Sequence, residues 1–168
     1  AGDVTIEATH GLEYAHATRT VAVRAGETTT VRVPLTRIDD LTARGWYSGD
    51  LHVHMNYGGT YRNTPTQLVR QARAEDLRVV EALIVNKEGR VPDLEYFRGA
   101  LDPASTRHVA LRFDEEFHTS YWGHLGLLGL REHVLLPGYA AYANTAARSI
   151  APMNADVVDR ARAQGAIV

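Results

Sequence analysis

The stretch that decides the fold reads GWYSGDLHVH over residues 45–54. If this stretch forms a strand, alternate side chains point to the same face. Asp50, His52 and His54 then share one face, and the apolar residues between them enter the core. Two imidazoles placed in this way can bind one or two divalent metal ions, and the aspartate can join them or orient His52. The stretch therefore predicts a strand that presents a metal site.

The spacing of the two histidines does not by itself separate a metal site from a chance pair. With eight histidines in 168 residues, roughly 0.4 pairs at this spacing are expected by chance. The surroundings favour a site, because an apolar strand ends here and the loop Asn56–Gly59 follows it. In α/β proteins, sites usually lie at the carboxyl ends of strands.

The composition is that of an ordinary globular protein. The 168 residues are 45% hydrophobic and 23% charged, enough for one good core or for one domain with a small appendage. A net charge of −2 gives no reason to expect nucleic acid or an anionic membrane as a partner, and no apolar run is long enough to span a membrane. Because cysteine is absent, any metal ion must be held by histidine, carboxylate or water.

The first 40 residues are predicted to be rich in strands. Apolar and polar residues alternate over 4–8, 20–24 and 29–35, with turns at Gly11 and at 25–27. Three such strands bury little on their own. They are therefore either the end of a β-sandwich-like domain or a sheet packed on the remainder of the chain.

From Gly45 onward, strands are expected to alternate with helices. Thr64 is placed to cap a helix, with Pro65 in its first turn and Gln67 able to complete a capping box. Apolar positions 68, 69 and 72 fall on one side of this helix. Residues 77–86 then form a mostly apolar run that indicates a buried strand.

The second half of the chain continues the alternation. A weakly patterned short helix is expected near 93–98, a strand over 109–118 and a glycine-spaced, tightly packed central strand over 123–130. Asn154 is expected to cap a last helix that Gly165 closes. Residues 166–168 begin a further strand. Since the chain also opens without methionine, we expect the natural protein to continue on both sides.

Three more potential metal ligands lie near predicted strands. Glu116 and His118 share one strand face, and His124 precedes an apolar strand. One carboxylate and three imidazoles that converge from separate strands make a site suited to zinc, manganese or iron. The ordinary alternatives are that His124 is a core histidine and that Glu115 and Glu116 are a solvated pair.

These elements together resemble a known family. Residues 49–54 resemble the first motif of the PHP (polymerase and histidinol phosphatase) metal-dependent hydrolases. Glu116 and the stretch Gly123–Leu130 resemble the glutamate and Gly-His elements of the carbaryl-hydrolase-like branch. The β-rich segment before Gly45 is similar to the segment that precedes the catalytic domain in secreted-type members, which favours an extracytoplasmic over a cytoplasmic location. The likeness covers about residues 45–168.

The resemblance implies an α/β fold: the front part of a distorted (β/α)7 barrel over residues 41–168, preceded by a short β-rich, sandwich-like segment over 1–40. It implies one to three divalent ions, held by His52, His54, Glu116 and His124 with Asp50 beside them. Two departures stand out. Asn86 and Lys87 occupy the positions of the Asp and His of the family's second motif, and the late His-Pro and Asp-x-His elements would lie beyond residue 168.

The reaction that the resemblance implies is hydrolysis of an amide, ester or carbamate bond in a small molecule by metal-activated water. Lys87 and Asp50 are the predicted catalytic residues; Lys87 either neutralises developing negative charge or is a solvated loop residue. The residues predicted to line the substrate cleft are Tyr57, Tyr61, His118 and Trp122. For the aromatic residues, packing in the core is the alternative.

Two alternatives to this function remain. The chain could be a phosphoesterase of the same superfamily, although no Arg/Lys-rich glycine loop for phosphate lies near the histidines. It could also be a degenerate, non-catalytic metal-binding or interaction module, which the changed second motif favours. A barrel without its later strands exposes a strand edge, so we also expect the fragment to self-associate and to hydrolyse little.

Overall fold

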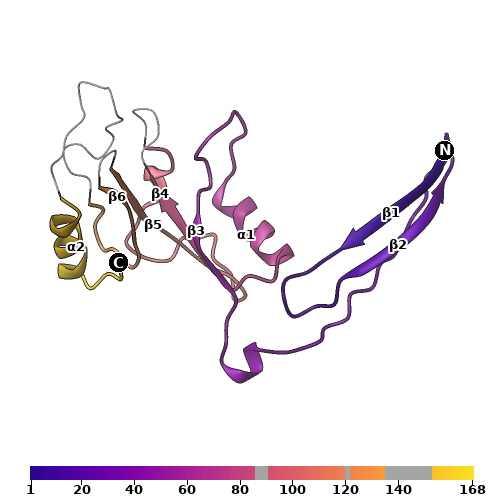
Figure 1. Cartoon of the computed structure of the whole chain (residues 1–168), viewed down its shortest axis with the longest axis horizontal. Coiled ribbons are helices and arrows are strands. Elements are labelled where there is room, and N and C mark those ends of the chain that lie inside the picture. The colour runs from indigo at the N-terminus through magenta and orange to yellow at the C-terminus, as the bar shows by residue number, and fades with distance from the viewer. Residues whose placement is uncertain (86–90, 120–121, 135–152) are drawn as a thin grey trace.

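The computed structural model describes residues 1–85, 91–119, 122–134 and 153–168 (Figure 1). Within these residues the chain is a mixed α/β protein with a two-stranded and a four-stranded sheet. No helix in the described ranges is long and apolar enough to cross a membrane. The elements are, in chain order, β1 (Gly2–Ala8), β2 (Ala17–Val23), the 3₁₀ turn η1 (Thr42–Arg44), β3 (Gly49–Val53), α1 (Pro65–Ala74), β4 (Val79–Ile84), the 3₁₀ turn η2 (Leu94–Tyr96), β5 (Ala110–Thr119), β6 (Gly123–Leu127) and α2 (Asn154–Ala163).

The amino-terminal segment forms a hairpin that extends away from the rest of the chain (Figure 1). Strands β1 and β2 pair antiparallel, as predicted from their alternation. The predicted third strand over 29–35 does not form. Pro34 lacks an N–H group, so it interrupts any ladder in this segment. The segment is attached instead by single hydrogen bonds, such as that from Arg19 Nη1 to the carbonyl of Arg32 at 3.2 Å.

The four-stranded sheet has the order β3-β4-β5-β6 and curls into a half-barrel. Strands β3, β4 and β5 are parallel, whereas β6 runs antiparallel to β5 at the edge of the sheet. The prediction of a central strand over 123–130 is therefore wrong. The reason is the connection: β5 ends at Thr119 and β6 begins at Gly123, and so short a link permits a hairpin but not the crossover that a parallel strand needs.

Helix α1 covers one face of this sheet. Thr64 caps it as predicted, accepting a hydrogen bond from the backbone N–H of Gln67 at 3.3 Å, and Pro65 occupies the first turn. The Gln67 side chain accepts from the Tyr61 hydroxyl at 3.4 Å, and Thr64 N donates to Asn63 at 2.9 Å, so the reciprocal capping box is not made. The predicted buried positions of α1 pack on β4 and β5 in one core cluster, made of Leu68, Val69, Ala72, Val80, Ala82, Ile84, Val109, Leu111 and Phe113.

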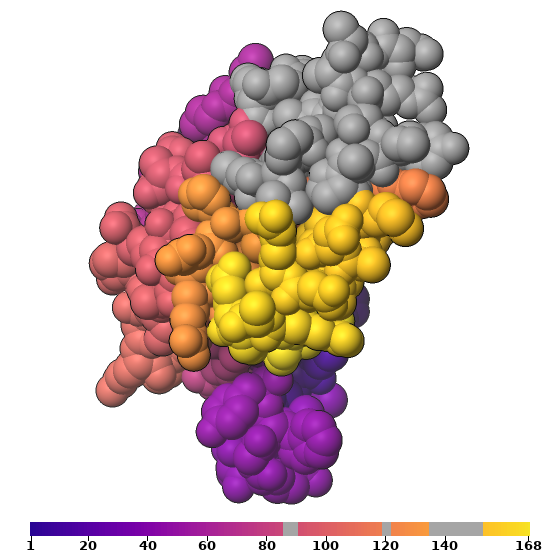
Figure 2. All heavy atoms as spheres, turned by 90° about the vertical axis from the view of Figure 1, so that its left-hand side faces the viewer, coloured from indigo at the N-terminus to yellow at the C-terminus, as the bar shows by residue number. Residues whose placement is uncertain are grey.

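Helix α2 closes a second core cluster around Phe117 of β5, with Leu127, Leu130, Val157 and Ala161 as fully buried partners. Figure 2 shows α2 in yellow against the orange segment that follows β6. The helix begins at Asn154, so the prediction that Asn154 is its cap is wrong.

The first turn of α2 shows why Asn154 is free for another role. Asp156 Oδ2 accepts from the N–H of Met153 at 3.1 Å and thereby closes the helix start. The side-chain nitrogen of Asn154 donates to the carbonyl of Trp122 at 3.0 Å. Asn154 therefore ties α2 to the beginning of β6, and Gly165, at φ +84°, ends the helix as predicted.

The face of the sheet turned away from both helices is polar. Asp114, which is fully buried, accepts hydrogen bonds from Gly129 N at 2.6 Å, Leu130 N at 3.0 Å and Arg112 Nε at 2.9 Å. Glu81 of β4 lies beside it. Burial, the hydrogen bond to Asp114 and the negative charge of Asp114 raise the pKa of Glu81 to about 8. Glu81 therefore keeps its proton to a higher pH in the folded chain than an ordinary glutamate does.

This raised pKa makes stability depend on pH. The folded state keeps a proton that the unfolded state releases, so raising the pH from about 5 to about 8 costs folding stability, and the loss levels off above pH 8. The Glu81→Gln variant mimics the protonated acid and should escape this loss. Between pH 5 and pH 8, the free energy of unfolding of Glu81→Gln should therefore rise relative to that of the parent. Because the side chain is partly exposed, we expect this relative rise to be about 1–2 kcal/mol. Urea unfolding at both pH values, with a chelator present, measures this difference in stability. The control is Glu27→Gln, because Glu27 is an exposed residue after β2, and its stability relative to the parent should not change between the two pH values.

Candidate metal centre

The carboxyl end of β3 carries two histidines that face each other. His52 lies in the strand and His54 follows its last residue. Their Nε2 atoms are 3.2 Å apart, and their rings meet edge to face with centroids 5.0 Å apart. The predicted shared face therefore holds for this pair.

Asp50 does not share that face. The pairing of β3 with β4 is irregular between Asp50 and Val53, so Asp50 pairs with Val80 and Val53 with Ala82, both core residues on the α1 side. This irregularity adds one residue to the alternation and turns Asp50 toward a groove beside Leu68 of α1. Asp50 Oδ1 accepts a hydrogen bond from the N–H of His52 at 3.0 Å. This bond holds the backbone at His52, where the imidazoles point to the side of β3 opposite Asp50. Leu51, expected in the core, is 53% exposed for the same reason.

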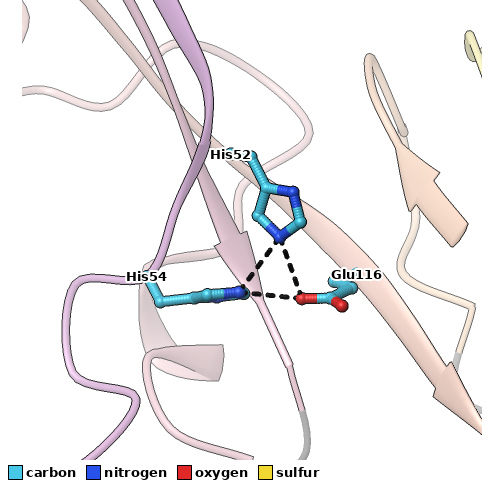
Figure 3. Close-up of side chains that lie close together, drawn as sticks. All are labelled: His52, His54 and Glu116. Carbon is cyan, nitrogen blue, oxygen red and sulfur yellow. Dashed lines mark hydrogen bonds and ion pairs between the residues drawn. The ribbon is translucent and has the colours of Figure 1, made fainter. Parts of the chain in front are cut away.

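Glu116 of β5 completes a compact group with the two histidines (Figure 3). Its Oε2 atom lies 2.8 Å from His54 Nε2 and 3.2 Å from His52 Nε2. Glu116 is 5% exposed, so the alternative of a solvated glutamate pair is wrong; its neighbour Glu115 is buried as well and accepts from Val134 N at 2.7 Å. One ligand atom from each of the three residues lies within 4.8 Å of the others, and the group could hold a metal ion.

The second nitrogen of His54 fixes how its ring can act. Nδ1 lies 2.9 Å from the backbone carbonyl of Leu83 and can only donate to it. In the neutral ring the lone pair is therefore on Nε2, which points to Glu116 and His52. Such a hydrogen bond is what orients most metal-binding histidines.

The charges of the group are set by these contacts. The hydrogen bond from His54 outweighs burial and, with those of His52 and His124, lowers the pKa of Glu116 to about 2. For His54, burial alone would lower the pKa, but the hydrogen bonds to Glu116 and Leu83 reverse this, and its pKa is raised. Glu116 is thus a carboxylate at all physiological pH values and offers a full negative charge to a cation.

The distances match those around a tetrahedral metal ion. With metal–ligand bonds of about 2.0–2.1 Å, two ligand atoms are about 3.3 Å apart. The three separations among the Nε2 atoms and Oε2 are 3.2, 3.2 and 2.8 Å. Two imidazoles and a carboxylate also form a donor set that proteins use for catalytic zinc, with a fourth position left open.

His124 approaches the same carboxylate from the other side. It lies on β6, opposite His118 in the β5–β6 pairing, and its Nδ1 atom is 2.6 Å from Glu116 Oε1. The rings of His118 and His124 lie against each other with centroids 3.9 Å apart. The structure thus brings three of the four predicted ligands into a group that could hold one ion and leaves His124 outside that group, with Oε2 of Glu116 turned to the β3 histidines and Oε1 to His124.

The predicted substrate-binding residues lie at different distances from this group. The Tyr57 ring is 5.0 Å from that of His54, and His118 adjoins it through His124. Tyr61 is 66% exposed and bonded to α1. Trp122, 42% exposed, flanks the start of β6. Lys87 and its neighbour Asn86 lie outside the described residues.

Sequence reasoning missed two supporting groups. One is the Leu83 carbonyl, which no side-chain pattern marks. The other is Asp93, which accepts from Asn56 N at 3.0 Å and from the Asn56 side chain at 2.6 Å. This pair holds the start of the loop that follows His54 and carries Tyr57. The feature that marks Asp93 as unusual is its left-handed backbone, at φ +68°, and this feature is visible only in the structure.

Comparison of the chain with protein-family models, with curated proteins and with solved structures finds no match. The function is therefore argued from the chemistry and geometry of the His52–His54–Glu116 group.

Proposed function

We propose that His52, His54 and Glu116 hold the catalytic metal ion of a hydrolase of the PHP type, which cleaves amide, ester or carbamate bonds in small molecules. The observation that carries this proposal is the triangle of Nε2, Nε2 and Oε2 atoms, with sides of 2.8–3.2 Å. The three atoms already stand about as far apart as ligands of one ion, so a divalent cation needs to displace only the proton that His54 Nε2 shares with Glu116 Oε2. Zinc suits two imidazoles and one carboxylate best, with manganese or iron as the alternatives.

Each side chain has a separate task in this proposal. When bound, the ion supplies Lewis acidity and lowers the pKa of water from near 16 toward about 7. His54 is held by Leu83 with its lone pair toward the ion, and Glu116 supplies the negative charge. His124 can hold or release a proton at Nδ1 against Glu116 Oε1, 2.6 Å away. Tyr57, beside His54, forms one wall for the substrate.

The arrangement of the strands supports the proposed fold. A ligand pair at the end of β3 and a glutamate on the parallel strand β5 are consistent with the front part of a distorted (β/α)7 barrel. The antiparallel β6 contributes His124 at the sheet edge. In a complete barrel, further strands would pair beyond this edge.

The test compares metal-dependent hydrolysis in matched variants. Chelated protein reloaded with zinc or manganese is assayed with p-nitrophenyl acetate, a p-nitroanilide, a nitrophenyl carbamate and p-nitrophenyl phosphate. Metal-dependent turnover of a carboxyl substrate should fall at least about 100-fold in His54→Ala. It should be unchanged in His16→Ala, whose exposed ring lies just before β2.

The remaining outcomes identify the rival functions. Turnover of the phosphate ester alone would make the chain a phosphoesterase. Tight metal binding without turnover of any substrate would make it a metal-binding module. Activity that survives in His54→Ala would contradict the proposed centre.

A further inference from the structure

A second polar site lies at the opposite end of the sheet from the metal centre. A cavity of about 240 Å³ opens where β4 and β5 begin, beside the last turn of α1. Its polar lining includes Arg73 of α1, Arg78 just before β4 and His108 just before β5, with His10, Tyr14 and Asp76 around them. The two histidine ligands lie at the carboxyl end of β3 and Glu116 lies in the second half of β5, away from the strand beginnings that form the cavity, so the cavity has no part in the proposed hydrolysis.

The imidazole of His108 lies between two guanidinium groups. Arg78 Nη1 is 3.2 Å from its Nδ1 atom, and Arg107 Nε is 2.8 Å from its Nε2 atom. A guanidinium can only donate hydrogen bonds, and a neutral imidazole accepts at one nitrogen alone. In one of the two contacts, an N–H group of the guanidinium therefore faces an N–H group of the imidazole. These two donors have no acceptor between them.

The cavity also carries an excess of positive charge. Arg73 of the lining, and Arg107, which lies beside His108 just outside the lining, have no carboxylate partner among the described residues. Asp76 is the one acid in the lining, and it is shared between Arg37 at 3.8 Å and Arg78 at 3.6 Å. Desolvation and the charges of Arg107, Arg78 and Arg73 lower the pKa of His108. The protein thus gathers three guanidinium groups around one neutral ring.

The carbonyl end of α1 does not cancel this charge. The last turn of a helix bears partial negative charge, but the carbonyl of Ala74 is engaged by His10 Nδ1 at 2.8 Å. His10 in turn packs against Tyr14, with ring centroids 4.4 Å apart. These contacts form a wall of the cavity and leave the guanidinium groups as its dominant charges.

We propose that this cavity binds a small multivalent oxyanion, namely phosphate or the phosphate group of a small metabolite, on Arg73 and Arg78 of its lining, with Arg107 reaching it from beside His108. Planar guanidinium groups match the oxygens of such an anion with paired hydrogen bonds. The anion supplies the acceptor that the His108 contacts lack. A cavity of about 240 Å³ is smaller than the pockets that hold drug-sized ligands, which suits a compact anion.

Calorimetric titration of the chelated full chain with inorganic phosphate, at ionic strength matched with chloride, tests the site. Saturable binding of one phosphate per chain is expected. Arg73→Gln and Arg107→Gln should each weaken it about tenfold or more, because each removes a hydrogen bond to a charged group. Arg70→Gln is the matched control: Arg70 is an exposed residue of α1 outside the cavity, and its loss should leave the affinity unchanged.

A parallel titration with glycerol 3-phosphate separates the two sources of the anion. Tighter binding than that of inorganic phosphate identifies a phosphorylated metabolite as the ligand, and weaker binding identifies the free ion. Absence of saturable binding for both would overturn the proposal, as would equal weakening in Arg70→Gln and Arg73→Gln. Circular dichroism of each variant checks that lost binding does not reflect lost folding. We expect all three variants to fold, because the replaced arginines lie on the surface.

Discussion

Replacing Glu116 with glutamine should weaken zinc binding at least about 100-fold while the chain stays folded. The carboxylate supplies the one negative charge of the His52–His54–Glu116 group, and Oε2 lies 2.8 and 3.2 Å from the two imidazole nitrogens. Glutamine keeps the size of the side chain but offers a neutral oxygen or an N–H group. Two imidazoles alone then remain for the ion, one of them on a largely exposed side chain.

Competition against a chromophoric chelator measures this loss. Glu132→Gln, an exposed glutamate in the segment after β6, should bind zinc like the parent. His124→Ala should fall between the two, with a loss of about tenfold, because His124 contacts Oε1 and orients the carboxylate rather than joining the triangle. Equal affinity of the parent and Glu116→Gln would mean that zinc binds elsewhere.

Two different grounds predict the members of this group: local geometry for His52 and His54, and the family resemblance for Glu116 and His124. The spacing of His52 and His54 predicts a shared face for a regular strand, and in the structure their Nε2 atoms do meet, at 3.2 Å. Local patterns predict a central strand over 123–130, so the β5–β6 hairpin that sets Glu116 and His124 in contact at 2.6 Å became visible only in the structure. Their role as metal ligands stays a prediction until binding is measured.

Asp50 shows where such reasoning stops. Alternation assigns it to the face of the histidines, but an irregular pairing within β3 turns it to the other side. Such an irregularity depends on how β3 fits β4, which no pattern within residues 45–54 records. The helix start at Thr64 could be predicted because a cap and a proline act within one turn. The prediction of a strand over 29–35 was wrong because a strand forms only with a partner strand for its hydrogen bonds.

The two acidic residues before Glu116 show the same limit more strongly. Composition suggests that neighbouring carboxylates face water, yet Asp114 and Glu115 are 0% and 1% exposed. Their partners are backbone N–H groups of the segment that returns after β6, at Gly129, Leu130 and Val134. Backbone donors leave no trace in the sequence, so this use of buried carboxylates became visible only in the fold.

Asp114→Asn should therefore destabilise the fold by about 3–5 kcal/mol, a large part of the stability of a typical domain. Asp114 accepts from Gly129 N, Leu130 N and Arg112 Nε at 2.6–3.0 Å. An asparagine must turn its NH₂ group toward at least one of these donors, which leaves a buried backbone N–H group without an acceptor and Arg112 without its carboxylate partner. Arg112 also donates to the carbonyl of Leu130, so the turn after β6 loses its attachment to β5.

Urea unfolding of the chelated protein measures the cost free of any metal contribution. The control is Asp159→Asn, an exposed position on α2, for which a change within about 0.5 kcal/mol is expected. Because the turn held by Asp114 is continuous with β6, its loosening should also displace His124 and weaken zinc binding by the same factor as His124→Ala. If Asp114→Asn unfolded at the same urea concentration as Asp159→Asn, the buried carboxylate would not be what joins β5 to the segment after β6.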